Sequence, residues 1–235
     1  MDFSVVVPFH NEAENVARLF TELRSCLEGR FEFEVVAVDD GSEDATLERL
    51  LEARRGWPRV RVLRHSGRSG QTAALRTGVR AARAEWIVTM DGDGQNDPRD
   101  IPSLLARREE AALVCGCRAG REDPWPKRVS SRVANAVRAW ALEDGTPDTG
   151  CGLKVFHRET FLRLPPFDHM HRFLPALFLR EGATVLSVEV SHRPRTHGRS
   201  HYGILDRLGV GLVDLFGVWW LRRRPISASA SEIED

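Results

Sequence analysis

The sequence is poor in cysteine, and its cysteines form no recognisable pairs. No two of them are spaced as a C-x-x-C pair or as the ligands of a zinc finger. They are Cys26, Cys115, Cys117 and Cys151. The first residues show no signal-peptide pattern. We therefore expect reduced thiols in a cytoplasmic protein, and neither a disulfide framework nor a cysteine-based metal centre.

The sequence also lacks a net charge. Its 34 Lys and Arg residues balance 34 Asp and Glu residues, so the overall field of the protein favours neither nucleic acid nor an acidic partner. A chain of 235 residues is long enough for one large α/β domain or two small ones. No internal repeat or clear linker divides it, which favours one domain.

No apolar run is long enough to cross a bilayer. The longest apolar region, residues 208–221, contains Asp214 and three glycines, and arginines occupy 222–224. This pattern fits an amphipathic helix better than a membrane span. Such a helix either lies on a membrane surface through its aromatic and basic residues or packs on the domain, and the residues leave both open.

Short apolar runs alternate with amphipathic stretches in the first half of the chain. Strands are expected at 3–8, 33–39, 59–63, 86–90 and 112–117, and helices at 11–26, 44–53 and 71–82. A helix at 129–142 and a strand at 185–190 follow. The alternation predicts an α/β fold with a mostly parallel sheet and helices on both faces. The continuous apolar strands agree with burial on both faces.

Two carboxylates and a carboxamide follow the apolar run at 86–90. They are Asp91, Asp93 and Gln95, each separated from the next by one glycine. Alternation along a strand end would place all three side chains on one side. Such oxygen ligands suit Mg²⁺ or Mn²⁺, and strand ends of open α/β sheets are where ligands bind. The segment predicts a metal–diphosphate site, although a D-x-D pair taken alone is also typical of a solvated turn.

Polar residues also follow the first two expected strands, at 8–12 and 39–42. If these strands are neighbours, both groups face one crevice, where a carboxylate can bind a ribose or a base edge. Gly41 would let the backbone approach a ligand. The alternative is that residues 40–42 form only a turn and a helix cap.

A glycine-containing loop at 65–70 precedes the third expected helix. Its backbone N–H groups could contact a phosphate at the start of that helix. The loop is not G-x-G-x-x-G, and it lacks the lysine of a P-loop. These absences disfavour a nicotinamide or P-loop site.

Taken together, the motifs resemble those of family 2 glycosyltransferases with a GT-A fold. Within that family they are similar to the polyprenyl-phosphate sugar transferases, which include the dolichyl-phosphate mannosyltransferase group and its undecaprenyl-phosphate relatives. The resemblance covers about residues 3–220. The motifs are Val7-Pro8 with Asn11-Glu12, Val38-Asp39-Asp40-Gly41-Ser42, Met90-Asp91-Gly92-Asp93-Gly94-Gln95, Asp148-Thr-Gly-Cys-Gly-Leu-Lys-Val-Phe156 and Gly198-Arg-Ser-His-Tyr202.

The resemblance implies a role for each matching residue. The nucleotide part of the donor would be held by Pro8, Phe9, Asn11, Glu12, Asp39, Asp40, Gly70 and Asp91, with Arg195 and Arg199 closing over it from a loop. The metal ligands would be Asp91, Asp93 and Gln95. The acceptor phosphate would contact Arg118, Arg128, Ser131 and Arg132. The residues expected to carry catalysis are Asp91, Asp93, Asp148, Arg118 and Arg128, with Asp148 near the sugar.

The implied activity is that of an inverting, metal-dependent hexosyltransferase that uses Mg²⁺ or Mn²⁺. It would move a sugar from a UDP- or GDP-sugar to a polyprenyl phosphate, in a cytoplasmic protein peripheral on the inner face of the membrane. Because a phosphate acceptor is already an anion, it needs arginines rather than a strong base. A hydroxyl acceptor would need a base, with Asp148 the first candidate. A non-catalytic nucleotide-sugar-binding module is a third possibility.

Three residues depart from the family pattern. His10 stands where relatives have tyrosine or another residue, and Gly94 replaces the usual leucine between Asp93 and Gln95. His201 stands where relatives often carry lysine, and a histidine is mostly neutral at pH 7. We expect one domain over residues 1–222, with a nucleotide-sugar half at about 1–118 and an acceptor half at about 119–222. The polar tail at 223–235 is expected to be disordered.

Overall fold

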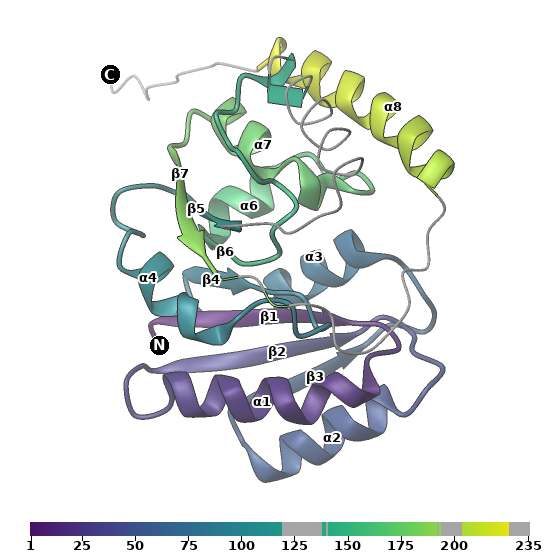
Figure 1. Cartoon of the computed structure of the whole chain (residues 1–235), viewed down its shortest axis with the longest axis vertical. Helices are drawn as coiled ribbons and strands as arrows, with labels where there is room; N and C mark the ends of the chain where they lie inside the picture. Colours follow the sequence, from purple (N-terminus) through teal and green to yellow (C-terminus); the bar gives the residue numbers. More distant parts are fainter. Residues whose placement is uncertain (119–137, 140, 192, 194–203, 226–235) are drawn as a thin grey trace, which may run out of the picture.

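A computed structural model describes residues 1–118, 138–139, 141–191, 193 and 204–225, and for 204–210 it describes the backbone alone. Seven strands form one mixed sheet in the order β3-β2-β1-β4-β6-β5-β7 (Figure 1). Their bounds are Phe3–Phe9 for β1, Phe33–Asp39 for β2, Val60–Arg64 for β3, Trp86–Thr89 for β4, Leu113–Arg118 for β5, Lys154–His157 for β6 and Val185–Val190 for β7.

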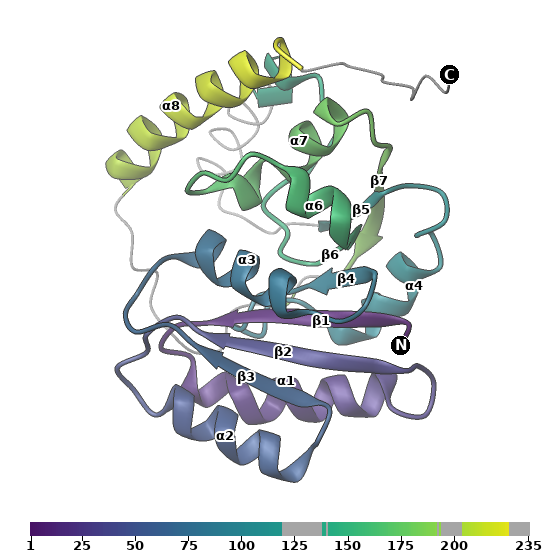
Figure 2. The same ribbon diagram turned by 180° about the vertical axis from the view of Figure 1, so that it is seen from behind.

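Helices cover both faces of the sheet. In Figures 1 and 2, α1 and α2 lie on one face, and α3, α6 and α7 lie on the other. The bounds of the α-helices are Ala13–Leu27 for α1, Thr46–Gly56 for α2, Gln71–Ala81 for α3, Ile101–Leu105 for α4, Arg158–Arg163 for α6, Leu174–Arg180 for α7 and Ile204–Arg222 for α8. Two 3₁₀ turns, η1 at Pro98–Asp100 and η2 at Met170–Arg172, precede α4 and α7. The predicted α/β fold is therefore confirmed.

The two faces form two apolar clusters, because successive side chains of a strand point to opposite sides. On β1, Val5 and Val7 pack in the cluster that contains Leu19 and Leu23 of α1. Val6 points the other way, into the cluster that contains α3 and α7. Burial on both sides accounts for the continuous apolar sequence of these strands.

The parallel part of the sheet places three strand ends at one edge. β1 lies between β2 and β4 and is parallel to both. Phe9 pairs with Asp39, so β1 and β2 end at the same level. The loops after β1, β2 and β4, which carry most of the predicted site residues, therefore leave the sheet together.

β6 is a strand that the sequence pattern does not reveal. It enters between β4 and β5 and is antiparallel to both, with Lys154 opposite Thr89 and Cys115. This insertion brings the loop at 148–152 beside the end of β4. The sheet is therefore mostly parallel, as predicted, with one reversed strand next to the site.

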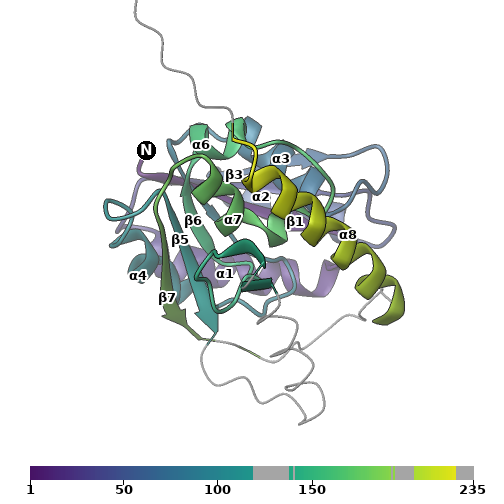
Figure 3. The same cartoon turned by 90° about the horizontal axis from the view of Figure 1, so that it is seen from above.

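The C-terminal helix α8 packs against α7 on the outside of the domain (Figure 3). Val218 is buried there, and Arg180 of α7 donates a hydrogen bond to the carbonyl of Leu221 at 3.1 Å. Asp214 Oδ2 lies 3.2 Å from Nδ1 of His169, next to η2. Among the helices in the described ranges, none is both long enough and apolar enough to cross a membrane.

Candidate active site

The loop after β4 holds the predicted metal ligands in a defined turn. Asp91 N–H donates to Asn96 Oδ1 at 2.9 Å, and Gln95 N–H donates to Asp93 Oδ1 at 3.1 Å. Gly94 has a φ of +74°, in the left-handed region that favours glycine. This backbone conformation explains why a glycine, rather than a leucine, suits position 94 of this chain.

Asp91 is crowded by other groups. Gln71 at the start of α3 donates to Asp91 Oδ1 at 2.8 Å. Gly152 lies so close that a Cβ on it would overlap the Asp91 carboxylate. Burial, and then the negative charge of Asp93, raise the pKa of Asp91 to about 6, against the opposing charges of Lys154 and Arg118. Such a carboxylate pair is stabilised when a cation offsets its repulsion.

The donor set fits a hard divalent cation. Carboxylate and carboxamide oxygens are the ligands that Mg²⁺ and Mn²⁺ prefer. Within the described ranges, no three His, Cys, Asp or Glu side chains are grouped as a metal site. The predicted set adds the carboxamide oxygen of Gln95 to the carboxylates of Asp91 and Asp93.

A cavity of about 480 Å³ opens at this edge of the sheet. It brings together four of the predicted residues: Asp91, Gln95, Arg118 and Asp148. Its other walls come from the start of α3, the loop at 149–152, β6 and the η2 turn, so residues far apart in the sequence meet there.

Arg118 and Asp148 form a two-point ion pair inside this cavity. Arg118 Nε and Nη2 donate to Asp148 Oδ2 and Oδ1 at 2.6 and 2.8 Å. Burial alone would lower the pKa of Arg118, but the Asp148 carboxylate raises it, so the guanidinium stays charged. Asp148 must give up one of these bonds to take a proton, which makes it a poor general base.

The sequence analysis assigned no role to three basic residues of the cavity: Lys154, His171 and Arg172. Lys154 is buried on β6, and its Nζ donates to the carbonyls of Thr149 and Cys151. The sequence feature that could have indicated Lys154 is a single charge inside an apolar run. No local signal marks His171 or Arg172, because only the fold brings the η2 turn to the cavity.

His171 is a neutral imidazole at neutral pH. Burial, and then the positive charges of Arg172 and Lys154, lower the pKa of His171 to about 3. Its Nδ1 lies 2.7 Å from the hydroxyl of Thr72, on the first turn of α3. The imidazole can therefore offer a hydrogen bond to a ligand but no charge.

The ends of β1 and β2 meet as expected. Asn11 N–H donates to Ser42 Oγ at 3.1 Å, and Asn11 Oδ1 accepts from Glu43 N–H at 2.9 Å. Glu12 N–H donates to Thr46 Oγ1 at 2.8 Å. These bonds join the two turns into one corner beside the loop after β4.

Asp39 has an unused carboxylate oxygen at this corner. The side chain is fully buried, and its Oδ1 accepts from Ser42 N–H at 3.2 Å. Its Oδ2 has no hydrogen-bond partner in the described part of the chain, although Arg64 Nε lies 3.5 Å away. Because a buried oxygen without a hydrogen bond is costly, the charge of Arg64 is the contact that offsets this cost in the described structure.

Asp40 binds the backbone of the loop that ends in Gly70. Asp40 accepts from Ser69 N–H at 2.9 Å and from Gly70 N–H at 2.8 Å, and His65 Nδ1 lies 2.7 Å away. Burial opposes ionisation, but the His65 contact and the two amides hold the pKa of Asp40 below its usual range. Two N–H groups of the 65–70 loop, those of Ser69 and Gly70, are thus engaged by this carboxylate.

Phe9 has a core position, while the side chain of Pro8 is half-buried. The Phe9 ring is 1% exposed and meets Phe20 edge-on at 6.0 Å between centroids. Its carbonyl accepts from Asp40 N–H at 2.8 Å. The remaining predicted residues, Arg128, Ser131, Arg132, Arg195 and Arg199, lie outside the described residues.

The fold is that of GT-A glycosyltransferases. Glucosyl-3-phosphoglycerate synthase from Mycobacterium tuberculosis, crystallised with Mn²⁺, UDP and glucosyl-3-phosphoglycerate, matches with a TM-score of 0.72 at 23% identity. The match covers 94% of this chain and 79% of that one. The same enzyme with Mg²⁺ and UDP gives a TM-score of 0.71 at 22% identity. At these identities the likeness establishes the fold.

The sequence defines the family. Residues 4–165 match the model of glycosyl transferase family 2, and the chain therefore belongs to that family.

The names of two curated relatives describe enzymes of polyprenyl phosphates. Dodecaprenyl-phosphate galacturonate synthase from Rhizobium johnstonii is 34% identical over 231 residues, 95% of this chain. Undecaprenyl-phosphate 4-deoxy-4-formamido-L-arabinose transferase from Proteus mirabilis is 32% identical over 210 residues, 88% of this chain. The matched regions cover 68% and 64% of these relatives, so the chain spans about two thirds of their length.

Proposed function

We propose that this chain transfers a sugar from a UDP- or GDP-sugar to a polyprenyl phosphate, with inversion at the anomeric carbon. The observation that carries the proposal is one cavity that contains Asp91 and Gln95 on one side and the Arg118–Asp148 pair on the other. The names of the two relatives support the acceptor class.

The order of strands suggests how the donor lies. The corner at β1 and β2, where Oδ2 of Asp39 lacks a hydrogen bond within the described residues, would hold the nucleoside. Asp91 at the end of β4 would lie beside the diphosphate. The sugar would then extend along the sheet toward β6 and β5, into the cavity. Gln71, Lys154, His171 and Arg172 would surround this end of the donor.

The metal would be held by Asp91, Asp93 and Gln95. When bound, a divalent cation offsets the negative charge that grows on the leaving diphosphate. The protein contributes a fixed turn. Gln71 orients Asp91, and the Asp93 carboxylate accepts a hydrogen bond from the backbone N–H of Gln95. The bond between the anomeric carbon and the diphosphate breaks as a bond to the acceptor phosphate oxygen forms.

No general base is needed for this acceptor, because a phosphate monoester is already an anion at pH 7. Arg118 keeps N–H groups beyond the two that bind Asp148, and these would contact the acceptor together with Arg128, Ser131 and Arg132 of the expected acceptor set. The pairing of Asp148 with Arg118 weighs against the alternative of a hydroxyl acceptor activated by Asp148.

The outer face of α8 would meet the membrane that contains such a lipid. Its exposed apolar side chains are Leu212, Val213, Phe216 and Trp220. At the end of the helix, the guanidinium carbons of Arg223 and Arg224 lie 4.2 and 5.2 Å from the ring centroids of Trp219 and Trp220. Aromatic and basic residues together suit the interface of an anionic membrane.

A donor panel tests the proposed function. The purified chain is incubated with Mn²⁺, a short polyprenyl phosphate and each of several UDP- and GDP-sugars, and the lipid products are identified by mass spectrometry. We expect one class of donor to give a lipid-linked sugar. Parallel reactions replace the lipid with a soluble glycan. Transfer to the glycan but never to the lipid would contradict the proposal and favour a hydroxyl acceptor.

A further inference from the structure

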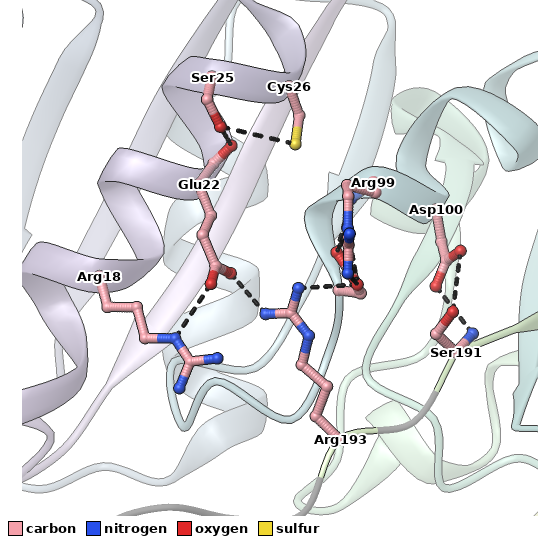
Figure 4. A network of polar contacts seen from close by, with 9 residues as sticks. Arg18, Glu22, Ser25, Cys26, Arg99, Asp100, Ser191 and Arg193 are labelled. Carbon is pink, nitrogen blue, oxygen red and sulfur yellow. Dashed lines mark hydrogen bonds and ion pairs between the residues drawn. The ribbon is translucent and has the colours of Figure 1, made fainter.

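Arg193, just after β7, connects three separate parts of the chain. Its guanidinium donates to Glu22 Oε2 of α1 at 2.6 Å and lies 2.7 Å from Asp97 Oδ2, at the end of the metal-binding loop. Its backbone N–H donates to the carbonyl of Gln95 at 3.2 Å. Figure 4 shows the side chain lying between α1 and this loop.

The same short segment is fixed at a second point. Ser191 N–H donates to Asp100 Oδ2 at 2.8 Å, on the η1 turn that follows the loop (Figure 4). The chain after β7 therefore runs along residues 95–100 and is bonded to both ends of that stretch. Gln95, whose side chain lines the cavity, is bonded through its peptide to Asp93 on one side and to Arg193 on the other.

Arg193 is also less exposed than the other arginines that bind the same two carboxylates. Its side chain is 20% exposed, whereas Arg99, which also binds Asp97, is 71% exposed, and Arg18, which also binds Glu22, is 47% exposed. Exposed ion pairs contribute little because water and salt screen them, while a shielded pair fixes geometry more firmly. Glu22 therefore depends chiefly on Arg193, while Asp97 is held by Arg193 together with Arg99.

We propose that Arg193 is a positioning residue for the metal site: it ties the loop at 91–97 to α1 so that Gln95 is held beside Asp91. This inference rests on the proposed function, because it assumes that the loop binds a metal. A metal site tolerates only small displacements of its ligands. Loss of an outer contact that orients a metal ligand typically weakens metal binding about 10- to 100-fold.

Mn²⁺ binding tests this role directly. The free Mn²⁺ signal is followed by electron paramagnetic resonance as the chain is titrated with Mn²⁺, with UDP in one series and GDP in the other. We expect Arg193→Gln to raise the dissociation constant for Mn²⁺ by about tenfold or more. Glu22→Ala, which removes the anchor on α1, should raise it in the same direction. The double variant should cost little more than Arg193→Gln alone, because both substitutions break one connection.

Arg18→Gln is the matched control, since it removes the exposed partner of Glu22 and leaves Arg193 in place. It should bind Mn²⁺ as the wild type does. Thermal unfolding of each variant checks that it is folded. If Arg193→Gln does not fold, the Mn²⁺ affinity of Glu22→Ala tests the inference in its place. If Arg193→Gln and Glu22→Ala both bind Mn²⁺ with wild-type affinity, the inference is overturned and the proposed function still stands. A wild-type chain that binds no Mn²⁺ with either nucleotide overturns the metal site of the proposed function, and the inference with it.

Discussion

At the scale of single residues, the position of Asp91 depends on a glycine. Gly152 follows the loop that carries Asp148, and the space a Cβ would fill there is already occupied by the Asp91 carboxylate. Asp91 and the Arg118–Asp148 pair can share one cavity only because residue 152 has no side chain. The glycine is thus as important to the site as the charged residues around it.

Gly152→Ala should therefore damage the site more than the fold. The added methyl group must displace the Asp91 carboxylate, so we expect turnover to fall at least about 100-fold, as small displacements in a catalytic site do. Steady-state rates measure the loss, and circular dichroism checks folding. Gly56→Ala, where the new methyl group meets open space, is the control. Equal activity in the two variants would show that Asp91 does not need this space.

Asp39 and Asp40 are adjacent, but their contacts predict different roles. Asp39→Asn removes a buried charge whose Oδ2 has no hydrogen-bond partner within the described residues. We expect it to weaken binding of UDP or GDP by about tenfold, the effect of losing one charged hydrogen bond, with little loss of stability. Isothermal titration calorimetry measures the affinity. Unchanged affinity for both nucleotides would place the nucleoside elsewhere.

Asp40 should instead contribute to stability, in a way that depends on pH. Its folded pKa is lowered by His65 and the amides of Ser69 and Gly70, against the effect of burial. A lowered folded pKa gives stability that is present above the unfolded pKa of about 3.9 and is lost as pH falls through the folded value. Asp40→Asn should thus be less stable than wild type at pH 7, by about 1–3 kcal/mol.

Urea unfolding at several pH values measures this difference. It should be constant between pH 7 and pH 5 and become smaller as the pH falls below about 4. A difference that grows with acid would contradict the assigned contacts.

At the scale of elements, the sequence predicts those whose pattern is local. β2 and β7 begin and end where expected, α1 differs from expectation by two residues at its start and one at its end, and α3 differs by one residue at its end. Their apolar residues repeat at strand or helix spacing within one element. β6, α6 and α7 were missed because they have four to seven residues, too few for a period to show. β6 is stabilised by pairing with β4 and β5, which are far away in the sequence, so its own residues do not reveal it.

The same distinction explains the site. The placing of Asp91 and Gln95 at this edge could be predicted because they follow one strand; Asp148 begins a motif, and Arg118 was assigned through the family resemblance alone. Residues of the η2 turn could not, since nothing near them in the sequence indicates a ligand. The bond between Asp40 and Gly70 could not be predicted either, because a motif does not show which partner takes each donor.

At the scale of the whole molecule, α8 contacts the segment that precedes the η2 turn of the site. The η2 turn, which lines the cavity, is adjacent to His169, whose ring lies 3.2 Å from Asp214 of α8. A membrane that met this helix would therefore present its lipid phosphates close to the cavity. α2 lies on the opposite side of the sheet (Figures 1 and 2).

Vesicle binding tests this arrangement. The chain should co-sediment with vesicles of phosphatidylglycerol and phosphatidylcholine, and less so at high salt. Phe216→Glu should reduce binding by about tenfold, because it places a charge on the apolar face of α8. Arg54→Gln, on α2, changes the net charge by the same amount and should have little effect. Equal losses in both variants would indicate that overall charge, not α8, sets the binding.

The most direct measurement compares wild type with Asp93→Ala for release of nucleoside diphosphate from the preferred nucleotide-sugar. The account predicts release by the wild type only when both Mn²⁺ and a polyprenyl phosphate are present, with a stoichiometric lipid-linked sugar. It predicts none above background for Asp93→Ala. Full activity in Asp93→Ala, or release that needs neither the metal nor the lipid, would contradict it.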